Sequence, residues 1–188
     1  MKVLAADFIG NSSTLTTSDP ALGKDFTAAS GKYIIATPTD GNGDINEESG
    51  VWFLDISSGS PVAGLLLPTL PEGWAYEGWA VIDGTPISTE TFIFALGSDN
   101  SGVYNGQVAG PPFPGEDFLN NAPEGLSFPV DLSSKTVVIS VEPVPDNSAA
   151  PFALKPLVSQ VASDVMTHTF QDMGNNAVAT NPTGSVTR

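Results

Sequence analysis

The sequence contains no cysteine, a single histidine, and only six basic residues against 21 acidic ones. Without cysteine, the chain has no disulfide, no thiolate metal ligand and no cysteine nucleophile. The lone histidine, His168, excludes a metal centre built from several histidines. No stretch approaches the roughly 20 consecutive apolar residues of a membrane-spanning helix, so the sequence predicts no transmembrane segment.

The excess of acidic residues limits the classes of molecule that the protein can bind. The formal net charge is −15 and the sequence pI is about 4.1. Nucleic acids and anionic membrane surfaces would be repelled, because binding to phosphates needs clustered lysine and arginine. Two interpretations of the acidity remain open: solubility in an exposed compartment, and attraction of cations or basic partners.

The sequence is rich in glycine and proline, the residues that favour turns. The 188 residues include 19 glycines and 16 prolines, while 40% of the chain is hydrophobic. Glycine and proline at this frequency exclude long helices and are typical of short strands joined by turns. We therefore predict an all-β fold, a two-sheet antiparallel sandwich with long Pro/Gly-rich loops, and keep an open barrel as the alternative. Residues 1–173 are predicted to form one domain, followed by an extended or poorly ordered tail over 174–188.

The strongest local pattern is a β-hairpin over Trp74–Phe94. Two strand-like runs flank Asp83-Gly84, a pair that tolerates the positive φ angles of a tight hairpin turn. A second predicted strand, Lys135–Val141, is dense in β-branched residues. Its pairing should stop at Pro143, which cannot donate a hydrogen bond to a neighbouring strand.

Weaker patterns complete the predicted elements. Asn11–Lys24 is expected to be loop, Glu116–Asn121 a single helical turn, and the spacing of Leu157, Val161 and Val165 favours a short late helix. Further strands are predicted at Lys2–Ile9, Lys32–Pro38, Val51–Ile56 and Ala63–Leu67. The order strand, acidic proline loop, returning strand occurs after Lys32 and again after Lys135, so residues 1–73 and 74–173 are candidates for an internal duplication, although ordinary turn signals produce the same order.

Three aromatic residues in the hairpin are the candidate ligand-binding residues: Trp74, Tyr76 and Trp79. Along a strand, Trp74 and Tyr76 share one face and Trp79 takes the other. They are expected to pack in the core, where large aromatic side chains contribute most, and an exposed member would suit a sugar-binding platform.

One loop resembles a cation site. Asp40, Asn42 and Asp44 alternate oxygen-bearing side chains, which suits a hard ion such as Ca²⁺. The EF-hand pattern then needs glycine at its sixth position and glutamate at its twelfth, where this chain has Ile45 and Val51. We therefore expect a solvated turn, with no metal and no cofactor.

Catalytic patterns are weak. His168 is not accompanied by a Gly-x-Ser-x-Gly elbow, so a serine triad is not predicted. Glu77, Asp83 and Glu142 flank the strongest strands, where two carboxylates could act in glycoside hydrolysis. We expect Glu77 and Glu142 instead to hold loops by accepting hydrogen bonds, and we predict no catalytic residue.

A family resemblance covers about Trp74 to Leu157. The segments Tyr76–Ile82, Gly84-Thr85-Pro86, Val138–Pro143 and Ala149-Ala150-Pro151 resemble, in order, motifs of the extracytoplasmic C-terminal domain of the anti-sigma-K factor family. Members show a Tyr-Glu-x-Trp strand, a Gly-x-Pro turn and a Val-Thr-Val-Glu-Pro strand before a small-residue and proline segment.

The resemblance implies a non-enzymatic β-sandwich outside the cytoplasm, secreted, periplasmic or on the cell surface. Its expected role is binding or envelope signalling, with an unidentified protein or glycan as ligand. The sigma-factor-binding region of that family lies outside the resemblance, so no such role is assigned to any residue here. We expect a stand-alone relative, exported by a leader not present in this sequence or held by a lipid anchor outside it. The alternative is a secreted carbohydrate-binding module.

Overall fold

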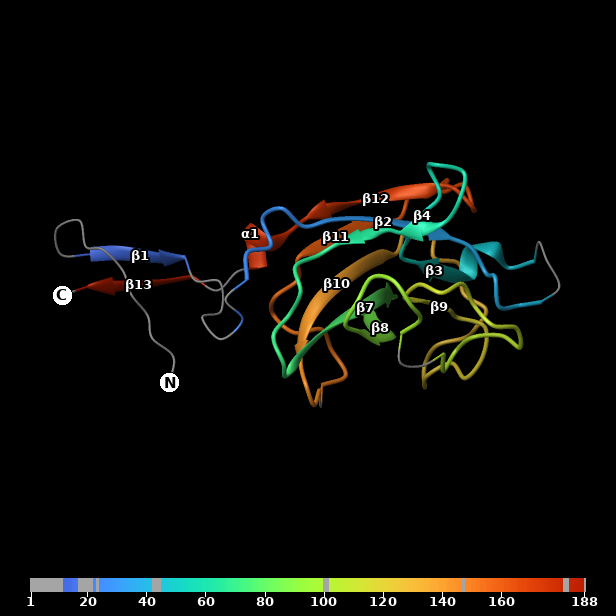
Figure 1. The fold of residues 1–188 in the computed structure, drawn as a ribbon. Helices are drawn as coiled ribbons and strands as arrows, with labels where there is room; N and C mark the ends of the chain where they lie inside the picture. The colour runs from blue at the N-terminus through green and yellow to red at the C-terminus, as the bar shows by residue number, and fades with distance from the viewer. Residues whose placement is uncertain are drawn as a thin grey trace.

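The computed structural model describes residues 12–16, 22, 24–41, 45–99, 102–146, 148–180 and 183–187. Within these residues the secondary structure is almost entirely β, which confirms the predicted class. The exceptions are a 3-10 turn, η1 (Glu47–Ser49), and a four-residue helix, α1 (Ala177–Thr180). Figure 1 shows a body of curved strands, from which a two-stranded ribbon extends to one side.

The strands of the described residues vary from two to nine residues in length. The bounds are β1 (Ser12–Thr16), β2 (Ser30–Ile35), β3 (Gly50–Trp52), β4 (Leu54–Asp55), β5 (Val62–Ala63), β6 (Leu65–Leu66), β7 (Trp74–Ile82), β8 (Thr85–Phe92), β9 (Gly115–Asp117), β10 (Thr136–Pro143), β11 (Leu157–Gln160), β12 (Phe170–Asn175) and β13 (Thr183–Thr187).

Most strands join one antiparallel sheet in the order β8-β7-β10-β11-β12-β2-β3-β9, with β6 paired to β2. The two end strands, β8 and β9, contact each other, so the sheet curls until it nearly closes. The small β4–β5 pair is separate. The predicted sandwich of two packed sheets is not confirmed, because the hydrogen-bonded path is continuous from β8 to β9. The twist of the sheet favours this closure, because a sheet that curls on itself leaves fewer strand edges without hydrogen-bond partners.

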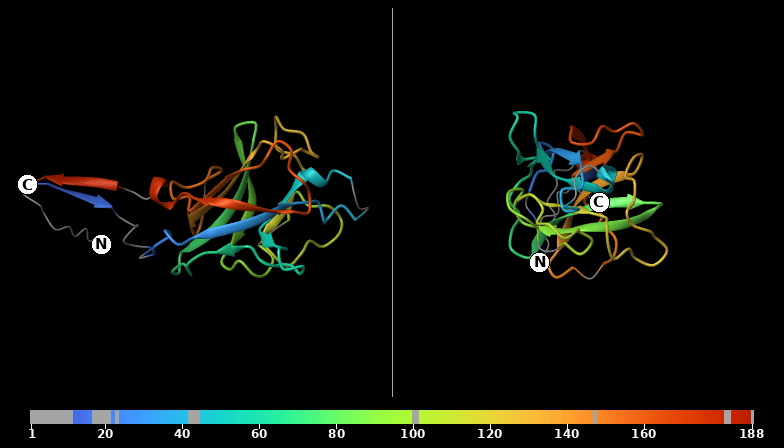
Figure 2. Two further views of the ribbon diagram at one scale, coloured as in Figure 1. Left: turned by 90° about the horizontal axis from the view of Figure 1, so that it is seen from above. Right: turned by 90° about the vertical axis from the view of Figure 1, so that its right-hand side faces the viewer.

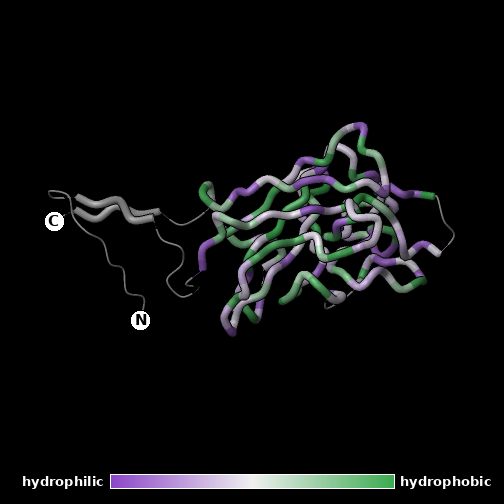
Figure 3. Tube along the Cα trace, turned by 45° about the horizontal axis from the view of Figure 1, so that its top comes forward, coloured by the Kyte–Doolittle hydropathy of each residue, from purple (hydrophilic) through white to green (hydrophobic). Residues whose placement is uncertain are grey.

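The inner side of the curled sheet encloses the main core. Successive side chains of a strand point to opposite faces of the sheet, and Figure 3 shows hydrophobic residues distributed along the strands of the body. The largest buried members of this core include Phe26, Tyr33, Phe53, Tyr76, Phe118, Leu132 and Ile139. A smaller cluster lies apart from it and contains Ile34, Ala36, Trp52, Leu54 and Phe113.

The predicted central hairpin is confirmed as β7 and β8. Its turn residues have positive φ angles, 50° at Asp83 and 85° at Gly84, as the sequence pair indicates. β7 and β8 pair with a shift in register between Glu77 and Trp79. Gly78 lies at this shift, where an added Cβ would come within 2.2 Å of Oγ1 of Thr89, so no larger residue fits.

The chain pairs two remote segments that the sequence placed in loop and tail. β1 and β13 form an antiparallel ribbon, with Ser12 opposite Thr187. Figures 1 and 2 show this ribbon set apart from the curled sheet. The prediction that Asn11–Lys24 is all loop is therefore wrong. Within the predicted tail, 174–188, the described residues contain the end of β12, α1 and β13.

Two helical predictions are also wrong. Glu116 lies in β9 rather than in a helical turn, because β9 completes the sheet beside β3. Leu157 begins β11, which pairs with β10 and β12. In both cases sheet pairing, which is not local, outweighs the local pattern. The predicted strand Lys2–Ile9 lies outside the described residues. The internal duplication stays a prediction, and strands from both proposed halves contribute to the one sheet.

Candidate functional site

The three predicted aromatic residues do not form one exposed platform. Tyr76 is 2% exposed and packs in the core between Phe26 and Phe92, with ring centroids 6.5 and 5.7 Å away. Trp79 is also 2% exposed, and its indole N–H donates to Oγ of Ser140 across 2.8 Å. These two residues therefore take the expected core positions.

Trp74 is the one predicted aromatic residue that remains half-buried. Its ring meets that of Phe152 edge-on, with centroids 6.0 Å apart, and Phe152 is 42% exposed. A partly exposed aromatic pair therefore stands at the start of β7. Of the three predicted aromatic residues, Trp74 is the most exposed.

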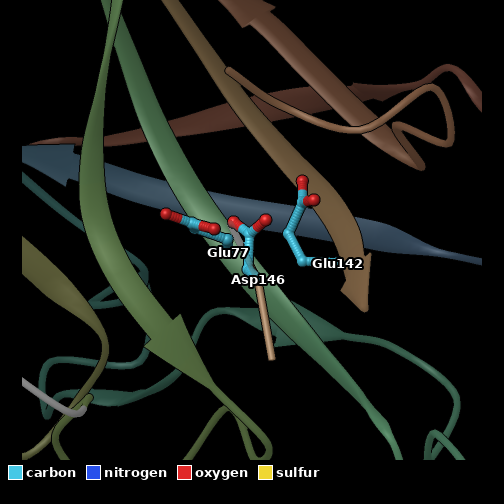
Figure 4. Close-up of side chains that lie close together, drawn as sticks. All are labelled: Glu77, Glu142 and Asp146. Carbon is cyan, nitrogen blue, oxygen red and sulfur yellow. The ribbon is translucent and has the colours of Figure 1, made fainter. Parts of the chain in front are cut away.

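Acidic side chains meet beside Trp79. Glu77 of β7, Glu142 of β10 and Asp146 of the following loop each offer a carboxylate oxygen, and these oxygens lie within 4.8 Å of one another. Figure 4 shows the three side chains lying close together. We call them the carboxylate cluster. The register explains the convergence: β7 and β10 are neighbours, Ser140 lies opposite Glu77, and Glu142 lies two residues further along the same face.

Hydrogen bonds hold one oxygen of each glutamate. Oε1 of Glu77 accepts the hydroxyl of Ser88 from β8. Oε1 of Glu142 accepts the hydroxyl of Ser140 and, across 2.8 Å, the backbone N–H of Phe152. Glu142 therefore holds the loop that follows β10 at Phe152, as predicted, whereas Glu77 accepts its bond from a strand, β8, and not from a loop. The Oε2 atoms of both glutamates are buried and have no hydrogen-bond partner among the described residues.

Burial governs the electrostatics of the cluster. It raises the pKa of Glu77 to about 7, against the opposing hydrogen bond from Ser88 and with added repulsion from Glu142 and Asp146. Burial also raises the pKa of Glu142, partly offset by its bonds from Ser140 and Phe152. Within the part of the chain that the structure describes, no lysine, arginine or histidine forms an ion pair with any of the three.

A groove of about 290 Å³ opens beside the cluster. Its walls come from β7, β8 and the loops around Tyr104, Pro123 and Ala149. The lining residues are Glu77, Trp79, Thr85, Pro86, Ile87, Ser88, Tyr104, Pro123, Ser148 and Ala149. Glu77 belongs both to this groove and to the carboxylate cluster, so an acidic group stands at one side of a largely apolar cleft.

A second acidic pair lies in β9. Glu116 is fully buried; its Oε1 accepts the backbone N–H of Tyr104 across 2.9 Å, and its Oε2 has no partner among the described residues. Burial raises the pKa of Glu116 to about 8. Asp117 is also fully buried, but it accepts bonds from the N–H and hydroxyl of Thr39 and from the indole of Trp52. Asp117 therefore has a structural role, because it links Thr39 to Trp52.

The other predicted site residues lie apart. Asp40 is half-buried, whereas Asn42 and Asp44 lie outside the described residues, so the calcium loop stays a prediction. Asp83 does not join Glu77 and Glu142; it pairs with Lys135 across 2.5 Å at the hairpin turn. His168 contacts Glu47 across 2.7 Å.

Sequence reasoning missed Asp146, Glu116 and Asp117. Asp146 follows two prolines in a turn-like stretch, Pro143-Val-Pro-Asp146, which indicated only a loop. The pair Glu116-Asp117 stands at the start of the segment that was predicted to form a single helical turn. A carboxylate between Pro114 and the core residue Phe118 was the available signal for burial.

No helix within the described ranges combines the length and the apolar character needed to cross a membrane. Comparison of the chain with protein-family models, with curated proteins and with solved structures found no match.

Proposed function

We propose that this protein is a non-enzymatic binding protein of the cell exterior, and that the groove beside Trp79 receives its ligand. The observation that carries the proposal is the groove itself: a concave, mostly apolar cleft with a few polar groups on its walls. Clefts of this kind are the usual form of ligand sites, and 290 Å³ is just below their usual range of roughly 300–1,000 Å³.

The lining favours a short apolar segment of a partner protein. Tyr104, Pro86 and Pro123 offer flat apolar surfaces, while Ser88 and Ser148 add hydroxyl groups at the wall. A cleft of this size accommodates one anchor side chain, and anchors seated in pockets carry most of the energy of protein interfaces. The resemblance to the anti-sigma-K factor domain supports the same class, an extracytoplasmic module for binding or envelope signalling.

The groove is tested by filling it. Ala149 is exposed and lines the groove, so Ala149→Trp should block it without disturbing the core. Ala162 is also exposed, is absent from the groove lining, and provides the matched control Ala162→Trp. Peptides selected from a displayed random library against the wild-type protein should keep their affinity for the control and lose at least about tenfold for Ala149→Trp.

Two results would contradict the proposal. Equal affinities for both variants would place the binding surface elsewhere. Mass spectrometry of the bound peptide after long incubation should show it intact, and cleavage that depends on Glu77 would make the protein an enzyme.

The carbohydrate-binding alternative has one supporting observation, the partly exposed pair Trp74 and Phe152. Aromatic faces stack on sugar rings, and these two rings lie at the start of β7. A glycan array probed with the wild-type protein and with Trp74→Ala distinguishes the alternatives. Glycan binding lost in a folded Trp74→Ala variant, together with no selected peptides, would favour the carbohydrate module.

A further inference from the structure

The carboxylate cluster places three acidic side chains close together, and its two glutamates are buried. Glu77 is 5% exposed and Glu142 is 1% exposed, yet both keep an Oε2 atom without a hydrogen-bond partner among the described residues. A buried polar atom normally finds a partner, because leaving it without one is unfavourable, and more so when it is charged. The structural role of Glu142, holding Phe152, occupies only Oε1. The Oε2 atoms therefore need a separate explanation.

The spacing suits one bound cation. Calcium–oxygen distances are about 2.3–2.6 Å, so two ligand oxygens on opposite sides of one Ca²⁺ are roughly 4.8 Å apart. One oxygen from each of Glu77, Glu142 and Asp146 lies within 4.8 Å of the others. The three oxygens are therefore close enough to one another to share a single ion of this size.

The donor set selects the class of metal. Every candidate ligand is a carboxylate oxygen, which is the preference of hard cations such as Ca²⁺ and Mg²⁺ rather than of soft transition metals. The chain has no cysteine, and its one histidine contacts Glu47 elsewhere. Copper, iron–sulfur and structural zinc chemistry thus lack their usual ligands here.

Supporting hydrogen bonds orient the carboxylates. The indole of Trp79 donates to Ser140, whose hydroxyl donates to Glu142, and the hydroxyl of Ser88 donates to Glu77. Outer-shell partners of this kind fix the ligands of metal sites in place. Because the strands also fix the backbone at Glu77 and Glu142, only the loop carrying Asp146 needs to adjust around an ion.

We propose that Glu77, Glu142 and Asp146 bind one Ca²⁺ ion, with water from the adjoining groove completing its coordination. The ion neutralises the buried carboxylates and ties the loop of Asp146 to β7 and β10. This inference goes beyond the groove's ligand, since Ca²⁺ binding is measured on the protein alone. Failure of either proposal therefore leaves the other intact.

The experiment compares three asparagine variants of the full chain after treatment with a chelator. Asp146→Asn removes a ligand charge while its side-chain oxygen can still accept the N–H of Ser148 (2.9 Å in the parent). Asp131→Asn is the matched control, because Asp131 accepts the N–H of Ser133 (2.7 Å) in the same type of turn on another loop. Asp40→Asn reports on the separate loop that the sequence indicated.

Calorimetric titration with CaCl₂ should reveal one site in the wild-type protein and in the Asp131→Asn and Asp40→Asn variants. At a hundredfold excess over Kd, Ca²⁺ should raise the melting temperature by about 5 °C or more. Asp146→Asn should bind at least about tenfold more weakly. Glu77→Gln, which keeps an acceptor for Ser88, should lose binding in the same way.

A luminescence measurement gives a second readout. Tb³⁺, which substitutes for Ca²⁺, emits when a nearby tryptophan is excited, and Trp79 lines the same groove as Glu77. Emission that is displaced by Ca²⁺ and lost in Asp146→Asn supports the site. The proposal is overturned if calorimetry detects no heat of Ca²⁺ binding to the wild-type protein and Ca²⁺ does not raise its melting temperature. It is equally overturned if Asp40→Asn, rather than Asp146→Asn, abolishes binding.

Discussion

The indole N–H of Trp79 in β7 donates to Oγ of Ser140 in β10 across 2.8 Å, and the same hydroxyl donates to Oε1 of Glu142. This chain of hydrogen bonds runs from a large buried aromatic residue to the carboxylate cluster. Trp79 therefore has two roles: it fills volume on its face of the sheet, and it fixes the direction of the Ser140 hydroxyl. Both roles can be separated by substitution.

Replacing Trp79 should reveal these roles. Trp79→Ala should lower the free energy of unfolding by about 3–5 kcal/mol, because it opens a large cavity at a position that is 2% exposed. Trp79→Phe keeps most of the volume and loses the donor, so we expect about 1–2 kcal/mol. Urea denaturation gives both values. Trp74→Ala, at a half-buried position, is the comparison, and a Trp79→Ala cost no larger than that of Trp74→Ala would contradict the core assignment.

The stability of the protein should depend on Glu116 between about pH 4.5 and pH 8. Burial raises the pKa of this carboxyl from 4.5 to about 8, with repulsion from Asp99 and Glu90 added and the Tyr104 N–H opposing. In that window the folded protein holds a proton that the unfolded chain has released. The free energy of unfolding therefore falls as pH rises, by up to about 1.4 kcal/mol per pH unit from this group, and levels off above about pH 8.

Glu116→Gln should remove this contribution, because the amide is neutral at every pH. The variant and the wild-type protein should have similar stability near about pH 4.5, and the variant should be the more stable above about pH 8. Glu124→Gln, at an exposed loop position, is the control. Parallel stability curves for Glu116→Gln and the wild-type protein across this range would show that Glu116 does not titrate as its burial requires.

Asp117 should be among the most sensitive polar positions. It is fully buried and accepts bonds from the N–H of Thr39 (2.7 Å), the Thr39 hydroxyl and the indole of Trp52 (2.7 Å). Asp117→Ala leaves these donors buried without an acceptor, at a cost of roughly 3 kcal/mol or more. Asp172→Ala, at an exposed position in β12, should change stability by less than about 0.5 kcal/mol. Thermal denaturation of the pair tests the contrast, and equal costs would refute it.

The ion pair at the hairpin turn should contribute little. Lys135 and Asp83 are 2.5 Å apart, but the Asp83 side chain is 70% exposed. Lys135→Met should therefore cost at most about 1 kcal/mol, and the difference should shrink in high salt because exposed charges are screened. Melting curves at low and high ionic strength provide the measurement. A large, salt-independent loss would mean that Lys135 acts through packing instead.

The sequence alone determined the elements whose causes are local. Asp83-Gly84 specified the β7–β8 turn because both residues take positive φ angles there. β-branched residues specified β10, and its pairing ends at Pro143 as predicted because proline offers no N–H for the ladder. The burial of Tyr76 and Trp79 likewise followed from their size and strand position.

Only the tertiary structure decided which distant segments meet. Residue types do not specify that β8 approaches β9, that β1 pairs with β13, or that Glu116 is buried inside the sheet. The carboxylate cluster arises in the same way. Glu77 and Glu142 are brought together by the register of β7 and β10, and Asp146 by the loop that follows β10. Strand periodicity tells which face a side chain occupies, but the neighbour on that face is set by the packing of the whole sheet.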